Sequence, residues 1–288
     1  MSSSDRAPRT DPHGANVDVV RFRLVGGEQP LAMLPIDVMG QGPRPFILDT
    51  GAARTMVDAA VARTLGLAAH DRREGRGIAG AVAVELMRVP SIAIGARTLT
   101  DLEVVATDLS ALAARIGGRV DGVLGHDVFG AARLVVDYRG LQVRLEWAPE
   151  APQPEAGAVD LPFELAGERK PLVMVPVMVN EAGPFRFAVD TGASTTLVTA
   201  AVAARAGIER GASDWVTGGG GGLGVHLARA RRIGVGSLGY ESVDVMIADL
   251  AGLAAVVGTI DGILGYNVLR SARVTFDYPA GILRLAPH

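Results

Sequence analysis

The chain has 288 residues, of which 49% are hydrophobic and 20% are charged. It therefore holds enough apolar material for one or two folded domains, and disorder of the whole chain is excluded. Its formal charge of −3 gives no electrostatic reason to expect a nucleic acid or an anionic membrane as a partner. The absence of cysteine excludes disulfides, thiol catalysis, zinc fingers and iron–sulfur clusters.

The N-terminal segment 1–16 is polar, and we expect it to be a disordered tail. It lacks the apolar core of a signal peptide, so none is expected in the chain as given. The compartment stays open between the cytoplasm and, with a signal removed, the periplasm. No run of 18 residues is apolar throughout, so no membrane span is expected. The five histidines show no ligand spacing, and we expect no metal and no cofactor.

The next segments indicate strands. Residues 17–25, 31–39 and 44–49 are short apolar or alternating runs bounded by Gly and Pro, which is typical of β-strands. A helix is predicted after Asp58, which precedes AAVARTL and is followed by Gly66, as an N-cap residue and a C-terminal glycine would be. In the second half Thr199 and Gly207 flank AAVAARA in the same way.

These elements occur twice. Adding 141 to a residue number in the first half reaches a matching residue, so that Asp49-Thr50-Gly51-Ala52 corresponds to Asp190-Thr191-Gly192-Ala193. After the loss of one residue the offset is 140, and Asp137-Tyr138 corresponds to Asp277-Tyr278. An offset kept over so long a span indicates duplication of one folding unit. The Pro-, Ala- and Glu-rich segment 148–158 is predicted to be a linker between lobes 17–147 and 159–288.

A carboxylate follows a buried strand in each unit, in FILDTGA (46–52) and FAVDTGA (187–193). A single carboxylate there would be costly to ionise. Two of them, brought together by a pseudo-twofold axis, would share a proton and titrate as a pair. One would then act as a base and the other as an acid at the same pH, which is what activating a water against an amide requires.

The paired DTGA motifs resemble those of the aspartic proteases. A second signature agrees, because each DTGA is followed about 73 residues later by a hydrophobic-hydrophobic-Gly segment, Val123-Leu124-Gly125 or Ile263-Leu264-Gly265. Each lobe resembles the short lobe of retroviral-type proteases more than a pepsin lobe, and the joining of two lobes in one chain resembles pepsins. The chain as a whole resembles a bacterial-type aspartyl protease. The resemblance implies a mostly β fold of two homologous retropepsin-like barrel lobes, with one or two short helices in each.

The resemblance also implies roles for individual residues. Asp49 and Asp190 would hold the attacking water and pass its proton on, without a covalent intermediate. Thr50 and Thr191 would lock the two lobes across the pair, and Gly51 and Gly192 would let the backbone pass close to the carboxylates. Ala52 and Ala193 complete the supporting set. The glycine motifs would lie beneath the pair. The flaps would be hairpins at 75–86 and 216–227, with tips near Ile78, Ala79 and Gly80 and near Gly220, Gly221 and Gly222; neither contains the tyrosine found in pepsin flaps.

Several features of the sequence are also compatible with other interpretations. DTG could be an ordinary strand-end turn, or the fold could be a catalytically silent peptide-binding protein. Residues 219–224 fit G-x-G-x-x-G, a dinucleotide pattern that needs a following helix. Arg229, Arg231 and Arg232 could form a solvated strand face or a basic subsite. Trp215 could supply flap surface or belong to the core or lobe interface.

Asp127 and Asn267 are predicted to cap a short helix, and His126 has only a weak case for supporting the dyad because Tyr266 is its equivalent.

The sequence therefore predicts an aspartic endopeptidase that acts on polypeptides as a monomer. An enzyme that processes only one cellular protein is a further possibility. Pepsins often carry Ser or Thr after DTG, whose hydroxyl can stabilise the carboxylate anion. Because Ala52 and Ala193 cannot do this, we expect activity from mildly acidic to near-neutral pH.

Overall fold

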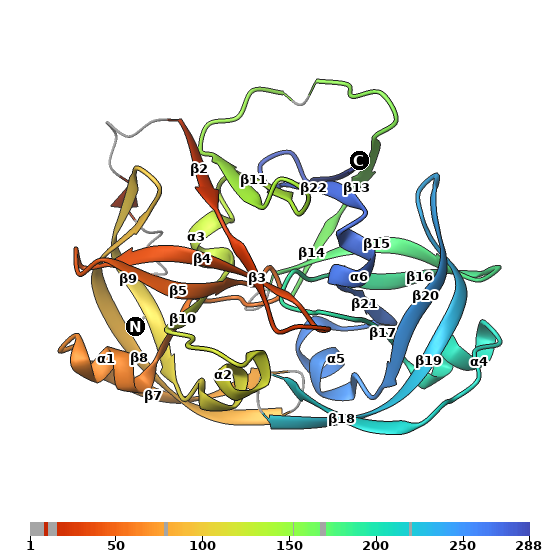
Figure 1. Cartoon of the computed structure of the whole chain (residues 1–288), viewed down its shortest axis with the longest axis horizontal. Helices are drawn as coiled ribbons and strands as arrows, with labels where there is room; N and C mark the ends of the chain where they lie inside the picture. The colour runs from red at the N-terminus through yellow and green to blue at the C-terminus, as the bar shows by residue number, and fades with distance from the viewer. Residues whose placement is uncertain (1–8, 11–15, 78–79, 152, 168–170, 219–220) are drawn as a thin grey trace.

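A computed structural model describes residues 9–10, 16–77, 80–151, 153–167, 171–218 and 221–288. The fold is mostly β, as predicted. Figure 1 shows the N-terminal half on the left and the C-terminal half on the right, with a further sheet above both. Among the described residues, every helix is too short or too polar to cross a lipid bilayer.

The N-terminal lobe is built on a ring of six strands. The ring closes because β8 pairs with both β4 and β9. Its strands, in spatial order, are β4 (Leu31–Val38), β5 (Pro43–Leu48), β10 (Gly122–Leu124), β6 (Met56–Asp58), β9 (Arg97–Thr107) and β8 (Gly80–Ile94). Attached to the ring are β1 (Arg9–Thr10), β3 (Arg23–Val25), β7 (Ala69–Gly77) and the helices α1 (Ala59–Thr64), α2 (Ser110–Ile116) and α3 (His126–Phe129).

The C-terminal lobe repeats this ring, which closes through pairing of β15 with β19. Its strands are β15 (Leu172–Val179), β16 (Ala182–Val189), β21 (Gly262–Leu264), β17 (Thr196–Val198), β20 (Leu238–Ala248) and β19 (Gly221–Val235). Attached to it are β14 (Glu164–Ala166), β18 (Ser213–Gly218), α4 (Ala200–Arg205), α5 (Ala251–Val257) and α6 (Tyr266–Leu269). The two matching rings give the duplicated sequence a duplicated fold.

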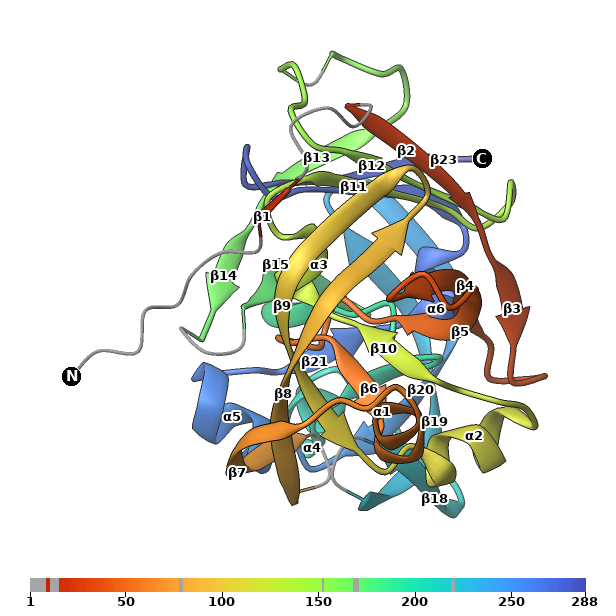
Figure 2. The same cartoon turned by 90° about the vertical axis from the view of Figure 1, so that its left-hand side faces the viewer.

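A six-stranded antiparallel sheet joins the halves. Its order is β13 (Val159–Pro162), β23 (Ile282–Pro287), β22 (Ala272–Asp277), β11 (Arg133–Asp137), β12 (Gln142–Glu146) and β2 (Val17–Arg21). At its centre Val135 pairs with Thr275, its own counterpart in the repeat, so the pseudo-twofold axis passes between them. Arg133 likewise forms an ion pair with Asp277 at 2.7 Å across the two central strands. Figure 2 shows the β8–β9 ribbon rising toward this sheet, and Ala96 N in its turn donates to Asp18 Oδ1 of β2 at 2.7 Å.

The apolar side chains form one large core shared by the lobes and a smaller cluster in each lobe. Each smaller cluster packs between the first barrel strands and a helix, α2 in one lobe and α5 in the other. Large buried side chains such as Phe46 and Phe187 are fully enclosed, and each contributes about 1.5–3 kcal/mol to folding. The smaller clusters form the floor of the space between the lobes.

The predicted helix caps are confirmed. Asp58 accepts hydrogen bonds from Ala60 N and Val61 N at the start of α1, and Thr199 accepts one from Val202 N at the start of α4. Gly66 follows α1 with φ of 71°, a left-handed conformation that glycine adopts without a steric penalty. Within the described residues each lobe also has a third short helix, α2 or α5, which was not predicted from the sequence.

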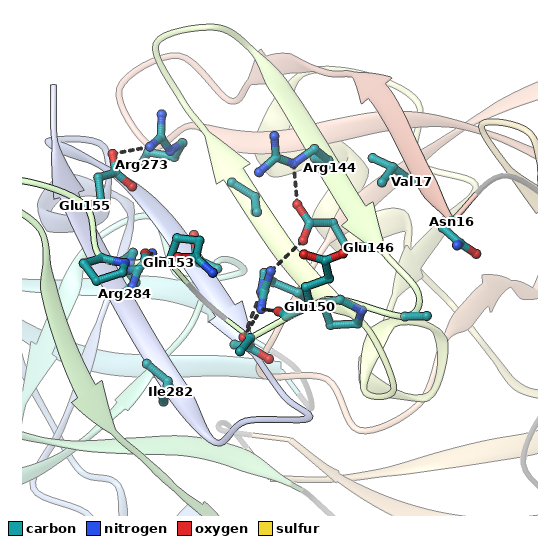
Figure 3. A pocket seen from close by; sticks show the side chains of 18 residues that line it. Asn16, Val17, Arg144, Glu146, Glu150, Gln153, Glu155, Arg273, Ile282 and Arg284 are labelled. Carbon is teal, nitrogen blue, oxygen red and sulfur yellow. Dashed lines mark hydrogen bonds and ion pairs between the residues drawn. The ribbon is translucent and has the colours of Figure 1, made fainter.

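The predicted linker crosses the outer face of the shared sheet. Its described residues form neither helix nor strand, and side chains of the sheet hold it. Arg284 donates to Gln153 O at 2.7 Å, Arg133 donates to Glu150 O at 2.5 Å, and Arg273 pairs with Glu155 (Figure 3). In the predicted tail, Arg9–Thr10 pairs with β9, while residues 1–8 and 11–15 lie outside the described part.

Candidate active site

The two DTGA aspartates stand at equivalent strand ends. Asp49 follows β5 and Asp190 follows β16, and both are partly buried. Their backbone amides donate to Leu124 O at 3.1 Å and to Leu264 O at 3.0 Å. Both carboxylates line a cleft of about 900 Å³ between the lobes, together with the glycines of both motifs.

The two threonines of the motifs lock the lobes to each other. Thr50 Oγ1 donates to Val189 O at 3.1 Å and accepts from Thr191 N at 3.0 Å. The mirror contacts are present, because Thr191 Oγ1 donates to Leu48 O and accepts from Thr50 N, both at 3.0 Å. Both side chains are almost fully buried, so each motif is held by the other lobe.

The two glycines bring the carboxylates together. Gly51 N donates to Asp49 Oδ1 at 2.8 Å, and Gly192 N donates to Asp190 Oδ1 at 2.7 Å. Each glycine also faces the opposite aspartate. A Cβ at Gly51 would lie 2.5 Å from Asp190 Oδ2, and one at Gly192 would lie 2.7 Å from Asp49 Oδ1. The arrangement requires glycine at both positions, because a side chain at either one would collide with the carboxylate of the other lobe.

The hydrophobic-hydrophobic-Gly motifs run alongside the aspartate strands. In the first lobe β10 pairs in parallel with β5, so Val123 lies beside Ile47 and Leu124 beside Leu48. The second lobe repeats this register, with Ile263 beside Ala188 and Leu264 beside Val189. The motif strands thus supply the carbonyls that hold the aspartate backbone.

The glycine that ends each motif passes very close to the loop after DTGA. A Cβ at Gly125 would lie 2.5 Å from the carbonyl carbon of Arg54, and one at Gly265 would lie 2.7 Å from that of Thr195. Gly125 N donates to Thr55 Oγ1 at 3.1 Å. Any larger residue there would push the DTGA loop away from its strand.

The prediction that Asp127 and Asn267 cap the following helix is wrong. The N-cap positions of α3 and α6 are Gly125 and Gly265, without a side-chain cap. Asp127 Oδ1 instead accepts from Thr55 N at 2.9 Å and Thr55 Oγ1 at 2.8 Å. Asn267 Oδ1 accepts from Thr196 N at 2.9 Å and Thr196 Oγ1 at 2.8 Å in the same way. Both side chains brace the DTGA loop of their own lobe.

The supporting alanines line the cleft without adding a polar group. Ala52 N donates to Asp49 O and Ala193 N to Asp190 O, both at 3.3 Å. The methyl groups belong to the cleft lining and offer no hydrogen bond to a carboxylate.

Two buried tyrosines lie close enough to the aspartates to feel their charge. Burial raises the pKa of Tyr138 and of Tyr278, and the nearby charge of Asp190 raises both further. The ring of His126 packs edge-on against Tyr278 of the other lobe at 4.9 Å between centroids, and Tyr266 packs against Tyr138 at 5.2 Å. Burial lowers the pKa of His126, which favours its neutral form in this aromatic layer.

Each lobe contributes a hairpin, β7–β8 or β18–β19, at the end of the molecule opposite the shared sheet (Figure 1). Residues of both hairpins line the cleft. The register brings Gly77 opposite Gly80 and Gly218 opposite Gly221. Of the predicted tip residues, Ile78, Ala79 and Gly220 lie outside the described part, whereas Gly80, Gly221 and Gly222 lie in β8 and β19. Each hairpin crosses to the other lobe, because β18 lies against α2 and β7 against α5.

Trp215 belongs neither to the core nor to a lobe interface. Its side chain is 76% exposed and rests against Gly222 of the paired strand. Its neighbour Val216 lines the cleft instead, because successive side chains of a strand point to opposite faces.

The remaining alternatives find little support. Arg229, Arg231 and Arg232 form exposed ion pairs with Asp244, Glu181 and Glu241, outside the cleft lining. The G-x-G-x-x-G pattern is continued by strand β19 rather than by a helix, so the context for dinucleotide binding is missing. Among the described residues no three His, Asp or Glu side chains gather as metal ligands would.

Three charged residues of the cleft were not predicted from the sequence. Arg54, Glu74 and Arg115 line it on the N-terminal side. Their counterparts in the repeat are the uncharged residues Thr195, Trp215 and Val256, of which Thr195 and Val256 also line the cleft. Comparing the two copies for differences, rather than for matches, could have found them.

Two sequence comparisons bear on the family. A family profile described as aspartyl protease matches residues 34–128 and again residues 175–268, together well over half of the chain. The chain belongs to the aspartyl protease family. Both matches contain a DTGA motif and end just beyond the glycine motif of their lobe. A comparison with curated proteins gives no match. Membership of the aspartyl proteases supports a protease-like function and identifies the fold as two family lobes in one chain.

Proposed function

We propose that this aspartyl protease family member is an endopeptidase that hydrolyses peptide bonds with a water activated between Asp49 and Asp190. One observation carries the proposal: the glycine of each DTGA motif faces the aspartate of the other lobe, so both carboxylates meet in one cleft. Both aspartates come from one chain, which supports a monomer as the acting unit. The cleft of about 900 Å³ can accommodate an extended peptide segment.

The proposed reaction needs only proton transfers. The ionised carboxylate takes a proton from the water as its oxygen attacks the peptide carbonyl carbon, while the protonated carboxyl donates to the carbonyl oxygen. In the resulting tetrahedral diol, the carboxyl that received the water proton donates it to the amide nitrogen, while the other carboxylate takes a proton from a diol hydroxyl. The C–N bond then breaks to give a carboxylic acid and an amine, and the aspartate pair is restored. No bond forms between enzyme and substrate. The threonine contacts across the lobes support this reaction by fixing the two carboxylates relative to each other.

An unfolded protein substrate at several pH values from 3 to 8 tests the proposal. The wild-type chain should cleave it, and Asp49→Asn and Asp190→Asn should each lower kcat/KM by about a thousandfold or more. Asp101→Asn is the matched control, because Asp101 is exposed and pairs with Arg88 on the surface. Thermal melting checks that the variants fold.

Two results would count against this reading. Cleavage that survives both substitutions would show that the aspartate pair does not do the chemistry. Peptide binding by the wild type without cleavage at any pH would favour the catalytically silent binding protein. Inhibition by pepstatin would add support.

A further inference from the structure

The two halves of the cleft differ in charge. Apart from Asp190, the cleft residues contributed by the C-terminal lobe are uncharged, whereas the N-terminal lobe contributes Arg54, Glu74, Asp108 and Arg115 beside Asp49. The repeat places Val256 at the position equivalent to Arg115, and Val256 also lines the cleft. A cation therefore stands at one side of the pseudo-twofold axis and an apolar side chain at the other.

Arg115 differs from its charged neighbours, each of which has a bonding partner. Arg54 forms an ion pair with Glu103 at 2.8 Å, Asp108 accepts from Ser110 N at 2.8 Å, and Glu74 is not free either. Within the described part of the chain, Arg115 makes no hydrogen bond or ion pair, and its Nε is buried without a partner.

Burial alone lowers the pKa of Arg115, which means that the folded protein disfavours its charge. Arginine nevertheless titrates far above neutrality and stays a cation in proteins. A carboxylate from outside the chain would compensate this cost, because a charge-assisted hydrogen bond to guanidinium is among the stronger polar contacts. This partly buried guanidinium in the cleft is therefore suited to binding a carboxylate.

The place of Arg115 in the cleft fits such a role. It lies in the last turn of α2, one turn after Leu112, which also lines the cleft. Helix α2 lies against β18, the hairpin strand of the opposite lobe. Arg115 therefore stands where the cleft wall of one lobe approaches the hairpin of the other, along the region that an extended substrate would occupy.

We infer that Arg115 binds a carboxylate of the substrate on one side of the scissile bond, an inference that rests on the proposed endopeptidase activity. The substrate class is then a polypeptide with an acidic group at one defined distance from the cleaved bond. A pseudo-symmetric cleft could hold a peptide in either direction, and a single carboxylate-binding arginine would select one of them. The carboxylate can come from an Asp or Glu side chain or from the C-terminus of the substrate.

Cleavage-site profiling of a diverse peptide library tests this inference. The wild type should show Asp and Glu enriched at one position on one side of the cleaved bond, and Arg115→Val, which installs the residue of the other lobe, should lose that enrichment. For a matched Glu and Gln peptide pair, we expect kcat/KM of the Glu peptide to fall about 10- to 100-fold in the variant. The Gln peptide should change by less than about threefold. Val256→Arg should add an acidic preference at the mirrored position.

Additional peptides and a second variant distinguish the possible sources of the carboxylate and the possible effects of the substitution. Peptides with a free or an amidated C-terminus show whether the carboxylate comes from the chain end or from a side chain. Arg115→Gln keeps the bulk of the side chain and should behave like Arg115→Val. An unchanged profile in both variants, with cleavage intact, would overturn the role of Arg115 and leave the endopeptidase standing. No cleavage of any library peptide by the wild type would instead overturn the proposed function.

Discussion

Replacing Asp127 by Asn should stabilise the protein at neutral and alkaline pH. Burial raises the pKa of Asp127 from 3.8 to about 6, although hydrogen bonds from Thr55 oppose the shift. Because the repeat places Asn267 at the equivalent position with the same contacts to Thr196, asparagine fits this site. In the second lobe, Asn267 Nδ2 also donates to Asp244 O at 2.7 Å, which shows how the amide group of an asparagine can be accommodated at this position.

The magnitude follows from the pKa shift. The folded state binds a proton more tightly than the unfolded state, so this group's stabilising contribution is complete below about pH 4 and is lost as pH rises through about 6. A shift of about 2 units at about 1.4 kcal/mol each gives up to about 3 kcal/mol. Asp127→Asn removes the titration, so its free energy of unfolding should exceed that of the wild type by up to this amount at pH 8 and differ little below pH 4.

Urea unfolding of both proteins across pH 4 to 8 measures the difference. Asn267→Asp is the reciprocal control, because it places a carboxylate in the equivalent site and should destabilise the protein at pH 8 more than at pH 4. A stability difference between Asp127→Asn and the wild type that does not change with pH would refute the reasoning, since only the titration of Asp127 makes it pH-dependent.

Three further predictions concern the aspartate pair. Thr50→Val removes the hydroxyl that bonds across to the other lobe, and it leaves a buried carbonyl and the Thr191 amide unpaired. The free energy of unfolding, measured with urea, should fall by roughly 2–4 kcal/mol. Thr50→Ser keeps the hydroxyl and should lower it much less. Gly51→Ala places a Cβ 2.5 Å from Asp190 Oδ2, so proteolysis should be lost while circular dichroism still shows a folded β protein, and full activity would contradict the geometry. Ala52→Ser supplies a hydroxyl near the pair, so the acidic limb of the pH–rate profile should move to lower pH. A limb that does not move would contradict the role given to alanine. So would a wild-type enzyme that is most active near pH 2 and inactive at pH 6.

The sequence was enough to predict the duplicated lobes, because the repeat is written residue by residue. It also predicted α1 and α4, since an N-cap residue and a following glycine are local signals. The third helix of each lobe was missed. Helix α2 has its own glycine, Gly117 with φ of 67°, but Leu109 at its N-cap makes no side-chain capping bond. The bond to Ser110 N comes instead from Asp108, one residue earlier, so the usual N-cap pattern is shifted by one position.

The wrong prediction for Asp127 has a different physical cause. Asp at the start of a short helix is typical of a cap, yet its partner Thr55 lies 72 residues away. A local pattern cannot show that a β-strand pairing brings such residues together. The same holds for Arg115, whose neighbour β18 belongs to the other half of the chain. Contacts between the lobes decide the cleft, and spacing along the chain does not reveal them.

The pairing of Val135 with its own counterpart Thr275 on the pseudo-twofold axis has a consequence for how such a cleft can diversify. An ancestor assembled from two identical chains would carry every cleft residue twice, once on each side of the axis. Any substitution there would alter both halves of the binding surface together. Joining the copies in one chain removes that coupling, so that one copy can keep valine at 256 while the other acquires arginine at 115. After covalent duplication, a substrate-binding residue can evolve on one side of the cleft alone. A homodimer of one lobe cannot do this, because each substitution appears on both sides.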